Sequence, residues 1–158
     1  MQQERQERQE RLAANINSVY SNYLNLSKNN LGEKSDAELI EILSAIPAIV
    51  TTLDLGKNDL GKKSGAELAQ ILVAIPATVT TLDLSKNNFG EKSDTELTEI
   101  LAAIPATITT LNLSDNNLEK QSGAALVRVF VAITAAVTTL NLSNNYFSCL
   151  KSTAELTE

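Results

Sequence analysis

Histidine and tryptophan are absent from the 158 residues, and Cys149 is the only cysteine. The lack of histidine excludes Ser-His catalysis and the common zinc sites, and it leaves the Cys149 thiol without an imidazole to activate it. A single cysteine cannot form an internal disulfide, so the fold does not need an oxidising compartment. We therefore expect a protein that holds no cofactor and no metal ion, and carboxylate chemistry is the catalysis that these absences leave open.

Clusters of positive charge and long apolar runs are also missing. The net charge of −6 and the pI near 4.7 argue against a surface for nucleic acid or anionic membranes. No apolar run approaches the ~18 residues of a membrane span, because Pro47, Pro76 and Pro105 interrupt the most hydrophobic stretches. Residues 1–8 carry charges with no apolar stretch behind them, which excludes an ordinary secretory signal in the chain as given. We expect a soluble, cytosolic protein that binds no nucleic acid and does not insert into a membrane.

Aromatic residues make up only 4% of the chain, and one short leucine-containing segment recurs instead. The segment Thr-Thr-Leu-Asp/Asn-Leu begins at residues 51, 80, 109 and 138, and a weaker copy, Asn-Tyr-Leu-Asn-Leu, begins at residue 22. Its first leucine recurs every 29 residues, and the three prolines keep the same spacing. A constant period of this length is typical of a solenoid built from stacked units.

Each unit has two halves with different apolar periods. Residues 50–60 fit the pattern L-x-x-L-x-L-x-x-N-x-L, whose alternating leucines predict a short strand with one buried face. The second half has apolar residues at i, i+3, i+4 and i+7, which cover one face of a helix. The four sets are Leu39, Ile42, Leu43, Ile46; Leu68, Ile71, Leu72, Ile75; Leu97, Ile100, Leu101, Ile104; and Leu126, Val129, Phe130, Ile133.

The boundaries of the predicted helices are marked in the sequence. Ser35, Ser64 and Ser93 are each followed three residues later by a glutamate, which is the signature of a capping box at a helix start. A proline follows Ile46, Ile75 and Ile104, and the residue before a proline disfavours helical geometry. We therefore expect the helices to end near these isoleucines.

The motif and the 29-residue unit resemble a leucine-rich repeat of the ribonuclease-inhibitor-like class. This resemblance covers roughly residues 19 to 158. It implies an α/β fold, a curved right-handed horseshoe segment with a parallel sheet on the concave face and helices on the convex face. It also implies a ladder of asparagine side chains that satisfy the backbone of the turn after each strand. The ladder residues are Asn29, Asn58, Asn87, Asn116 and Asn145.

Residues 77–88 have the sequence Ala-Thr-Val-Thr-Thr-Leu-Asp-Leu-Ser-Lys-Asn-Asn. They are similar in sequence to repeats in another group of proteins. These are leucine-rich-repeat effectors that an intracellular bacterial pathogen injects into host cells by type IV secretion. The resemblance implies a non-enzymatic module that binds a host protein. An effector of this kind is translocated into the cytoplasm of the host cell.

The two ends differ from the repeats between them. Residues 1–18 begin with good helix formers, and we expect a helix that caps the hydrophobic end of a repeat domain spanning 19–158. That domain has about five repeats, the last incomplete at Glu158. The uncovered last repeat has three explanations: a longer parent protein, a short natural end, or an edge covered by a partner or by a second copy as a homodimer. Residues 152–158 fit either a repeat remnant or a glutamate-containing secretion tail.

The side chains that flank the inward leucines are expected to project from the concave face and to contact a protein partner. The interpretation left open is that these residues only keep the strand face soluble. If they are functional, the lysines form a ridge beside small side chains that could take an extended acidic segment. The candidate residues are Tyr23, Lys28, Thr52, Asp54, Lys57, Thr81, Asp83, Lys86, Thr110, Asn112, Asp115, Thr139, Asn141 and Asn144.

Two patterns that look chemical have simpler explanations. Residues 56–64 come close to a phosphate-binding loop, but Lys63 stands where the Mg²⁺-binding hydroxyl belongs, and other units have serine in place of Gly56. Asp54 and Asp83 would lie ~4.8 Å apart on adjacent strands, but an exposed sheet lacks the further oxygen ligands and cavity of a cation site.

The functional alternatives that remain are the targeting arm of a larger enzyme, such as a ubiquitin-ligase effector, and a self-associating scaffold.

Overall fold

The computed structural model describes residues 21–133 and 135–147 as five strands in one sheet, each of the first four followed by a short 3-10 turn and a helix. The predicted capping helix at 1–18 lies outside the described residues, as does the end of the last repeat. Every strand pairs in parallel with the strand of the next repeat, in the order of the sequence. The register joins residues 29 positions apart, so that Leu53 faces Leu82 and Leu82 faces Leu111. The predicted fold class is therefore confirmed.

The strands are three residues long, and they are β1 (Tyr23–Asn25), β2 (Thr52–Asp54), β3 (Thr81–Asp83), β4 (Thr110–Asn112) and β5 (Thr139–Asn141). The central leucine of the first four strands is buried, and the two residues beside it are exposed or half-buried. This alternation follows from the pleat, because successive side chains in a strand point to opposite faces. One face of the sheet thus belongs to the core, and the other carries the flanking polar residues.

Four helices lie on the core side of the sheet: α2 (Asp36–Ser44), α3 (Gly65–Val73), α4 (Asp94–Ala102) and α5 (Gly123–Ala132). The predicted capping boxes are present at the starts of α2, α3 and α4, where a serine accepts the N3 amide and the N3 glutamate accepts the serine amide. In α5 the residue at N3 is Ala125, so Ser122 caps the helix alone.

The helices end near the predicted isoleucines, since α2, α3 and α4 end at Ser44, Val73 and Ala102, two residues before Ile46, Ile75 and Ile104. The backbone changes from α-helical to 3-10 hydrogen bonding before the proline. The Ile46 amide bonds to the carbonyl of Leu43, and the same three-residue spacing recurs at Ile75. A bond of this spacing belongs to a 3-10 turn, which is common at the ends of α-helices.

The hydrophobic core runs the length of the stack between sheet and helices, and most of the predicted helix positions contribute to it. Phe130 is the exception among the large side chains. It is 38% exposed, whereas Leu72 and Leu101 at the same position in α3 and α4 are 1% and 0% exposed. The reason is positional, because Phe130 lies on the last described helix and none of the described helices follows it.

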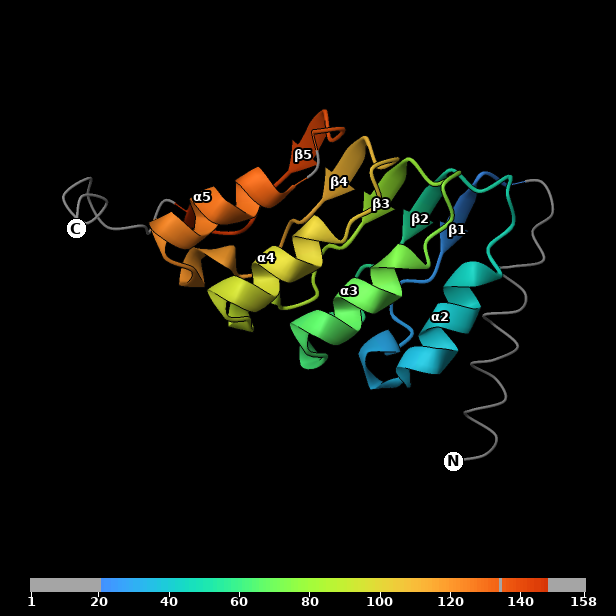
Figure 1. The fold of residues 1–158 in the computed structure, drawn as a ribbon, viewed down its shortest axis with the longest axis horizontal. Helices are drawn as coiled ribbons and strands as arrows, with labels where there is room; N and C mark the ends of the chain where they lie inside the picture. Colours follow the sequence, from blue (N-terminus) through green and yellow to red (C-terminus); the bar gives the residue numbers. More distant parts are fainter. Residues whose placement is uncertain (1–20, 134, 148–158) are drawn as a thin grey trace.

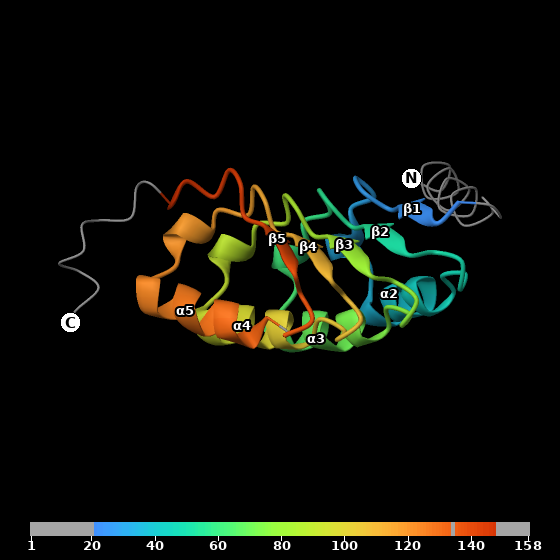
Figure 2. The same ribbon diagram turned by 90° about the horizontal axis from the view of Figure 1, so that it is seen from above.

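Sheet and helices form two layers that run side by side along the molecule (Figure 1). The view from above shows the strands as one layer and the helices as the other (Figure 2). Strands pack ~4.8 Å apart whereas packed helices need ~8–10 Å, so a stack of such units curves with the sheet on its inner, concave side. No helix among the described residues is long and apolar enough to cross a membrane.

Candidate protein-binding surface

The turn after each strand is fixed by an asparagine at the end of the motif. Asn87 is fully buried, and its side-chain amide donates to the carbonyls of Leu55 and Leu84 at 3.1 and 3.0 Å. Its oxygen accepts the amides of Asn58 and Leu60 in the preceding repeat at 3.1 and 3.2 Å. Asn58 and Asn116 repeat this arrangement, and Asn145 makes the matching bonds at the last repeat. At the first repeat, the Asn29 side chain donates to the Ser27 carbonyl. The ladder holds the strand ends of neighbouring repeats in register.

The outer face of the sheet carries two columns of polar side chains, one on each side of the central leucines. The first column is Tyr23, Thr52, Thr81, Thr110 and Thr139, and the second is Asn25, Asp54, Asp83, Asn112 and Asn141. The three inner strands hold these positions half-buried, and the two outer strands expose them. Because every described helix lies on the opposite side, these columns form a surface that another molecule can reach (Figure 1). We call this surface the sheet face.

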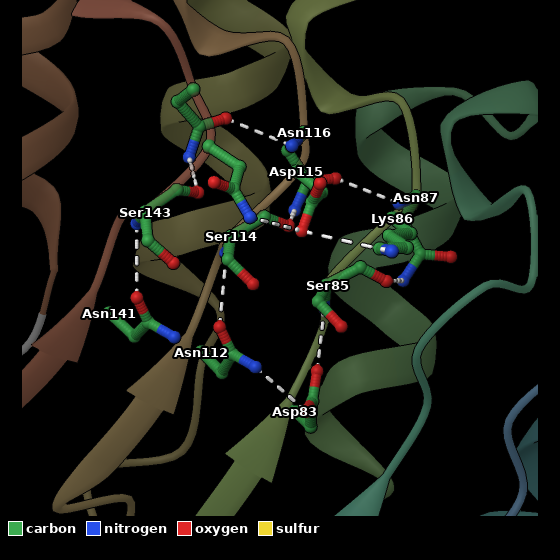
Figure 3. Close-up of polar contacts among 12 residues, drawn as sticks. Asp83, Ser85, Lys86, Asn87, Asn112, Ser114, Asp115, Asn116, Asn141 and Ser143 are labelled. Atoms are coloured by element: carbon green, nitrogen blue, oxygen red, sulfur yellow. Dashed lines mark hydrogen bonds and ion pairs between the residues drawn. The ribbon is translucent and has the colours of Figure 1, made fainter.

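The second column has a local structural role that the sequence reasoning missed. Each of its carboxylate or amide oxygens accepts the backbone amide two residues further on, as Asp83 does from Ser85 at 2.8 Å and Asn112 from Ser114 at 3.0 Å. The same bond occurs at Asn25, Asp54 and Asn141. Figure 3 shows these bonds in a row at the ends of three strands. The signal that could have found them is an Asp or Asn two residues before the turn, the pattern of an Asx-turn.

The second oxygen of each aspartate in this column is also occupied. Oδ2 of Asp83 accepts the side-chain amide of Asn112 at 2.7 Å, and Oδ2 of Asp54 accepts the Tyr23 hydroxyl at 3.1 Å. Burial and this hydrogen bond raise the pKa of the Tyr23 phenol above its ordinary value of 10.0, and the charges of Asp54 and Asp83 add to the effect. Both aspartates are therefore held by neutral donors rather than by lysine.

A third column follows the second at the edge of the sheet face, in the turn itself. Its members are Lys28, Lys57, Lys86, Asp115 and Asn144, and all have a left-handed backbone, with φ between 56° and 60°. The three lysines are exposed, as the sequence analysis expected for a ridge. Lys86 lies 4.0 Å from Asp115 in the next repeat, the contact drawn in Figure 3. Within the described residues, Lys28 and Lys57 have no ion-pair partner within 4.0 Å.

The structure brings the predicted partner-binding residues together on this one side of the molecule. The first column, called the threonine column below, and the second, called the Asx column, lie on the strands. The third, called the Lys/Asp/Asn column, lies in the adjacent turns. Neutral donors hold the carboxylates of Asp54 and Asp83. Among the described residues, no group of three acidic, cysteine or histidine side chains is gathered as for a metal ion.

Comparison with known proteins agrees with this geometry. The family model described as Leucine Rich repeat matches residues 50–69, 76–92 and 105–127, segments that contain β2, β3 and β4 and the 3-10 turn after each. The chain is a leucine-rich-repeat protein. No curated protein matches it.

One solved relative of this leucine-rich-repeat protein is the leucine-rich repeat-containing protein LegL7 from Legionella pneumophila, known from a crystal structure. The two are 48% identical and superimpose with a TM-score of 0.77. The match covers 84% of this chain but 41% of LegL7, so this chain spans less than half the length of that protein.

The leucine-rich-repeat stack also contains a second ladder, at the residues directly before the helix N-caps, which the sequence reasoning missed. The ammonium group of Lys63 donates to the carbonyl of Lys34 and to Asp36, both at 2.7 Å, and Gln121 donates to the carbonyl of Lys92 at 2.9 Å. Both side chains are more than 90% buried. Their burial shows that these polar groups are structural, in contrast to the lysines beside the sheet face.

Proposed function

We propose that this leucine-rich-repeat protein is a non-enzymatic interaction module that binds a protein partner on its sheet face. The observation that carries the proposal is the parallel sheet, whose outer face no described helix covers and on which polar side chains stand in regular columns. The column Asn25, Asp54, Asp83, Asn112 and Asn141 is held in place by hydrogen bonds to the backbone of the turn. A surface fixed in advance loses little conformational entropy when a partner binds.

We further propose that the partner is a host protein and that the chain is a bacterial effector delivered by type IV secretion into the host cytoplasm. Two observations support this proposal. The chain is similar to LegL7 of Legionella pneumophila, at 48% identity, and the sequence of residues 77–88 resembles repeats of such effectors. The similarity of residues 77–88 includes residues of the sheet face, because Thr81 and Asp83 lie within this segment.

The proposal is tested by site-specific photocrosslinking of the full chain in a eukaryotic cell lysate. A photoreactive residue replaces Thr81 at the centre of the sheet face, and in a matched variant it replaces Glu99 on the exposed side of α4. We expect the Thr81 position to capture a discrete protein that the Glu99 position does not. Capture of the same proteins with equal yield at both positions would contradict the assignment of the sheet face.

The boundaries of the domain are part of the same proposal: residues 1–18 form a cap, and residues 19–158 form the repeat domain. The support comes from the first described repeat. Leu24 and Leu39 are 2% and 1% exposed, as deeply buried as their counterparts inside the stack. Leu140 in β5 is only partly buried. Deleting residues 2–18 should therefore expose the first repeat and lower the free energy of unfolding.

Self-association through the last described repeat is a second candidate function, because one observation favours it. Val127 and Phe130 on α5 are 62% and 38% exposed, although the counterparts of Phe130 in the other helices are buried. Apolar side chains of this kind are normally covered in a stable solenoid. Sedimentation of the full chain, compared with a Val127→Glu variant, separates the two functions. A dimer that the substitution dissociates supports self-association, and a monomer at high concentration removes it.

A further inference from the structure

We propose that the partner segment bound at the edge of the sheet face is an extended acidic peptide, held by the row of Lys28, Lys57 and Lys86. This inference rests on the proposed protein-binding function and names the chemistry of the partner. It concerns three consecutive repeats, since the row ends where Asp115 and Asn144 take the same position.

The backbone of the row is unfavourable for lysine. All three lysines have φ between 56° and 60°, a region that costs an L-residue with a side chain about 1–2 kcal/mol and that asparagine and aspartate tolerate best. The fourth and fifth repeats have Asp115 and Asn144 there, so the fold itself accepts the residues that suit the geometry. Packing does not explain the three lysines either, because their side chains are exposed. Their stems and ammonium groups are therefore available to something outside the described fold.

Within the described residues, Lys28 and Lys57 have no ion-pair partner within 4.0 Å, and Lys86 has one at that limit. The nearest column contains Asp54 and Asp83, but their oxygens accept hydrogen bonds from backbone amides, from the Tyr23 hydroxyl and from the Asn112 amide. Only Lys86 reaches a carboxylate, that of Asp115 at 4.0 Å, the limit of an ion pair. The lysines elsewhere behave differently: Lys62 and Lys120 pair with Glu33 and Glu91 of the preceding repeat.

The spacing of the row defines the shape of its ligand. Neighbouring parallel strands are ~4.8 Å apart, so three lysines in register span about 10 Å along the stack. An extended chain advances ~3.3 Å per residue, so a stretch of about three to five residues covers the row. Like charges held at this spacing repel one another, and a chain of carboxylates placed over them removes that repulsion. Beside Lys57 and Lys86 the two columns on the strands carry Thr52, Asp54, Thr81 and Asp83, none of them bulky, and Tyr23 stands only at the first repeat.

The test uses the full chain and synthetic peptides about ten residues long: one of glutamate, one of glutamine and one of lysine, each with a fluorescent label. We expect the glutamate peptide to bind at least about ten-fold more tightly than the other two. Raising the salt from about 50 to about 300 mM should weaken its binding several-fold, because the charges are exposed and screened. Equal affinity for the glutamate and glutamine peptides would overturn the proposal.

A pair of variants with matched charge locates the site. Lys28→Asn/Lys57→Asn/Lys86→Asn removes three positive charges and places asparagine where the backbone favours it, so this variant keeps its fold. Lys62→Gln/Lys120→Gln/Arg128→Gln removes the same charge away from the sheet face. We expect the first variant to lose at least about ten-fold in affinity for the glutamate peptide and the second to change by less than about two-fold. Equal losses in both variants would show attraction by net charge alone and would overturn the proposal.

The proposed function and this inference can fail separately. If the photoreactive residue at Thr81 still captures its protein in the triple asparagine variant with unchanged affinity, the sheet face binds a partner but the lysine row does not read acidic residues. If the row binds the glutamate peptide and no protein is captured at Thr81, the acidic specificity stands and the function of the sheet face falls.

Discussion

The amide of Asn87 shares its hydrogen bonds between two repeats, so its loss should be costly. Replacing it with alanine leaves the buried backbone amides of Asn58 and Leu60 without their acceptor. Each such group costs about 1–3 kcal/mol, so we expect Asn87→Ala to lower the free energy of unfolding by about 3 kcal/mol or more. Asn29→Ala, at the half-buried start of the ladder, should cost about 1 kcal/mol. Urea denaturation compares the two, and equal losses would contradict the ladder's role.

Lys57 illustrates a residue that the fold tolerates rather than requires. Its backbone has φ 56° and its side chain is exposed, so asparagine or glycine should fit the turn better. We expect Lys57→Asn to raise the free energy of unfolding by about 0.5–1 kcal/mol. Lys63→Asn serves as the comparison, because it removes a buried amine that bonds to Lys34 and Asp36 and should destabilise the protein. A destabilised Lys57→Asn would mean that the lysine has a structural role.

At the scale of the elements, the capping boxes make the helices sensitive to acid. The backbone amide and hydroxyl of Ser93, with the amide of Gly65 and the charge of Lys92, lower the pKa of Glu96 from 4.5 to about 2. A carboxyl with a depressed pKa stabilises the fold above its unfolded pKa, and this contribution disappears as the pH falls. We therefore expect stability to decrease between about pH 4.5 and pH 2, and less steeply in Glu96→Gln. Thermal unfolding across this range measures both slopes, and identical slopes would contradict the assignment.

Much of each element could be predicted from the sequence, because a 29-residue period fixes strand, turn and helix by simple counting. The alternating leucines located the strands, and the Ser-x-x-Glu pattern located three helix starts. The helix ends were harder, since the 3-10 turn at Ile46 depends on a hydrogen bond rather than on the proline that follows. The Asx column and the left-handed lysines could not be read from hydropathy, because both depend on backbone angles in the turn.

The candidate site was predicted as a set of positions but not as a set of roles. The strand register places Tyr23, Thr52 and Thr81 in one column, as the motif spacing predicted. The sequence did not show that Asp54 and Asp83 are occupied by neutral donors, a fact that leaves the neighbouring lysines unpaired or weakly paired within the described residues. The lysines are therefore not consumed in ion pairs with these aspartates, which supports the acidic segment that the sequence already suggested for this face.

At the scale of the whole molecule, burial should decide how much each repeat contributes to stability. Leu82 in the middle strand is fully buried between two other repeats, whereas Leu140 in β5 is only partly buried. We expect Leu82→Ala to cost about 3 kcal/mol and Leu140→Ala about 1 kcal/mol, because the cost follows the amount of apolar packing around the removed side chain. Chemical denaturation of the two variants tests this gradient. A larger loss at Leu140 would indicate that the last repeat is covered in solution.

The function proposed for the molecule depends on the sheet face being the binding surface. The most direct test is the affinity of the purified partner captured at Thr81, measured for Thr81→Arg and for Glu99→Arg. The first places a long side chain at the centre of the sheet face, and the second makes the same kind of change on the exposed side of α4. We predict that Thr81→Arg weakens binding at least about 100-fold, or about 2.7 kcal/mol, while Glu99→Arg changes it by less than about two-fold. Loss of binding in Glu99→Arg with full binding in Thr81→Arg would contradict the account.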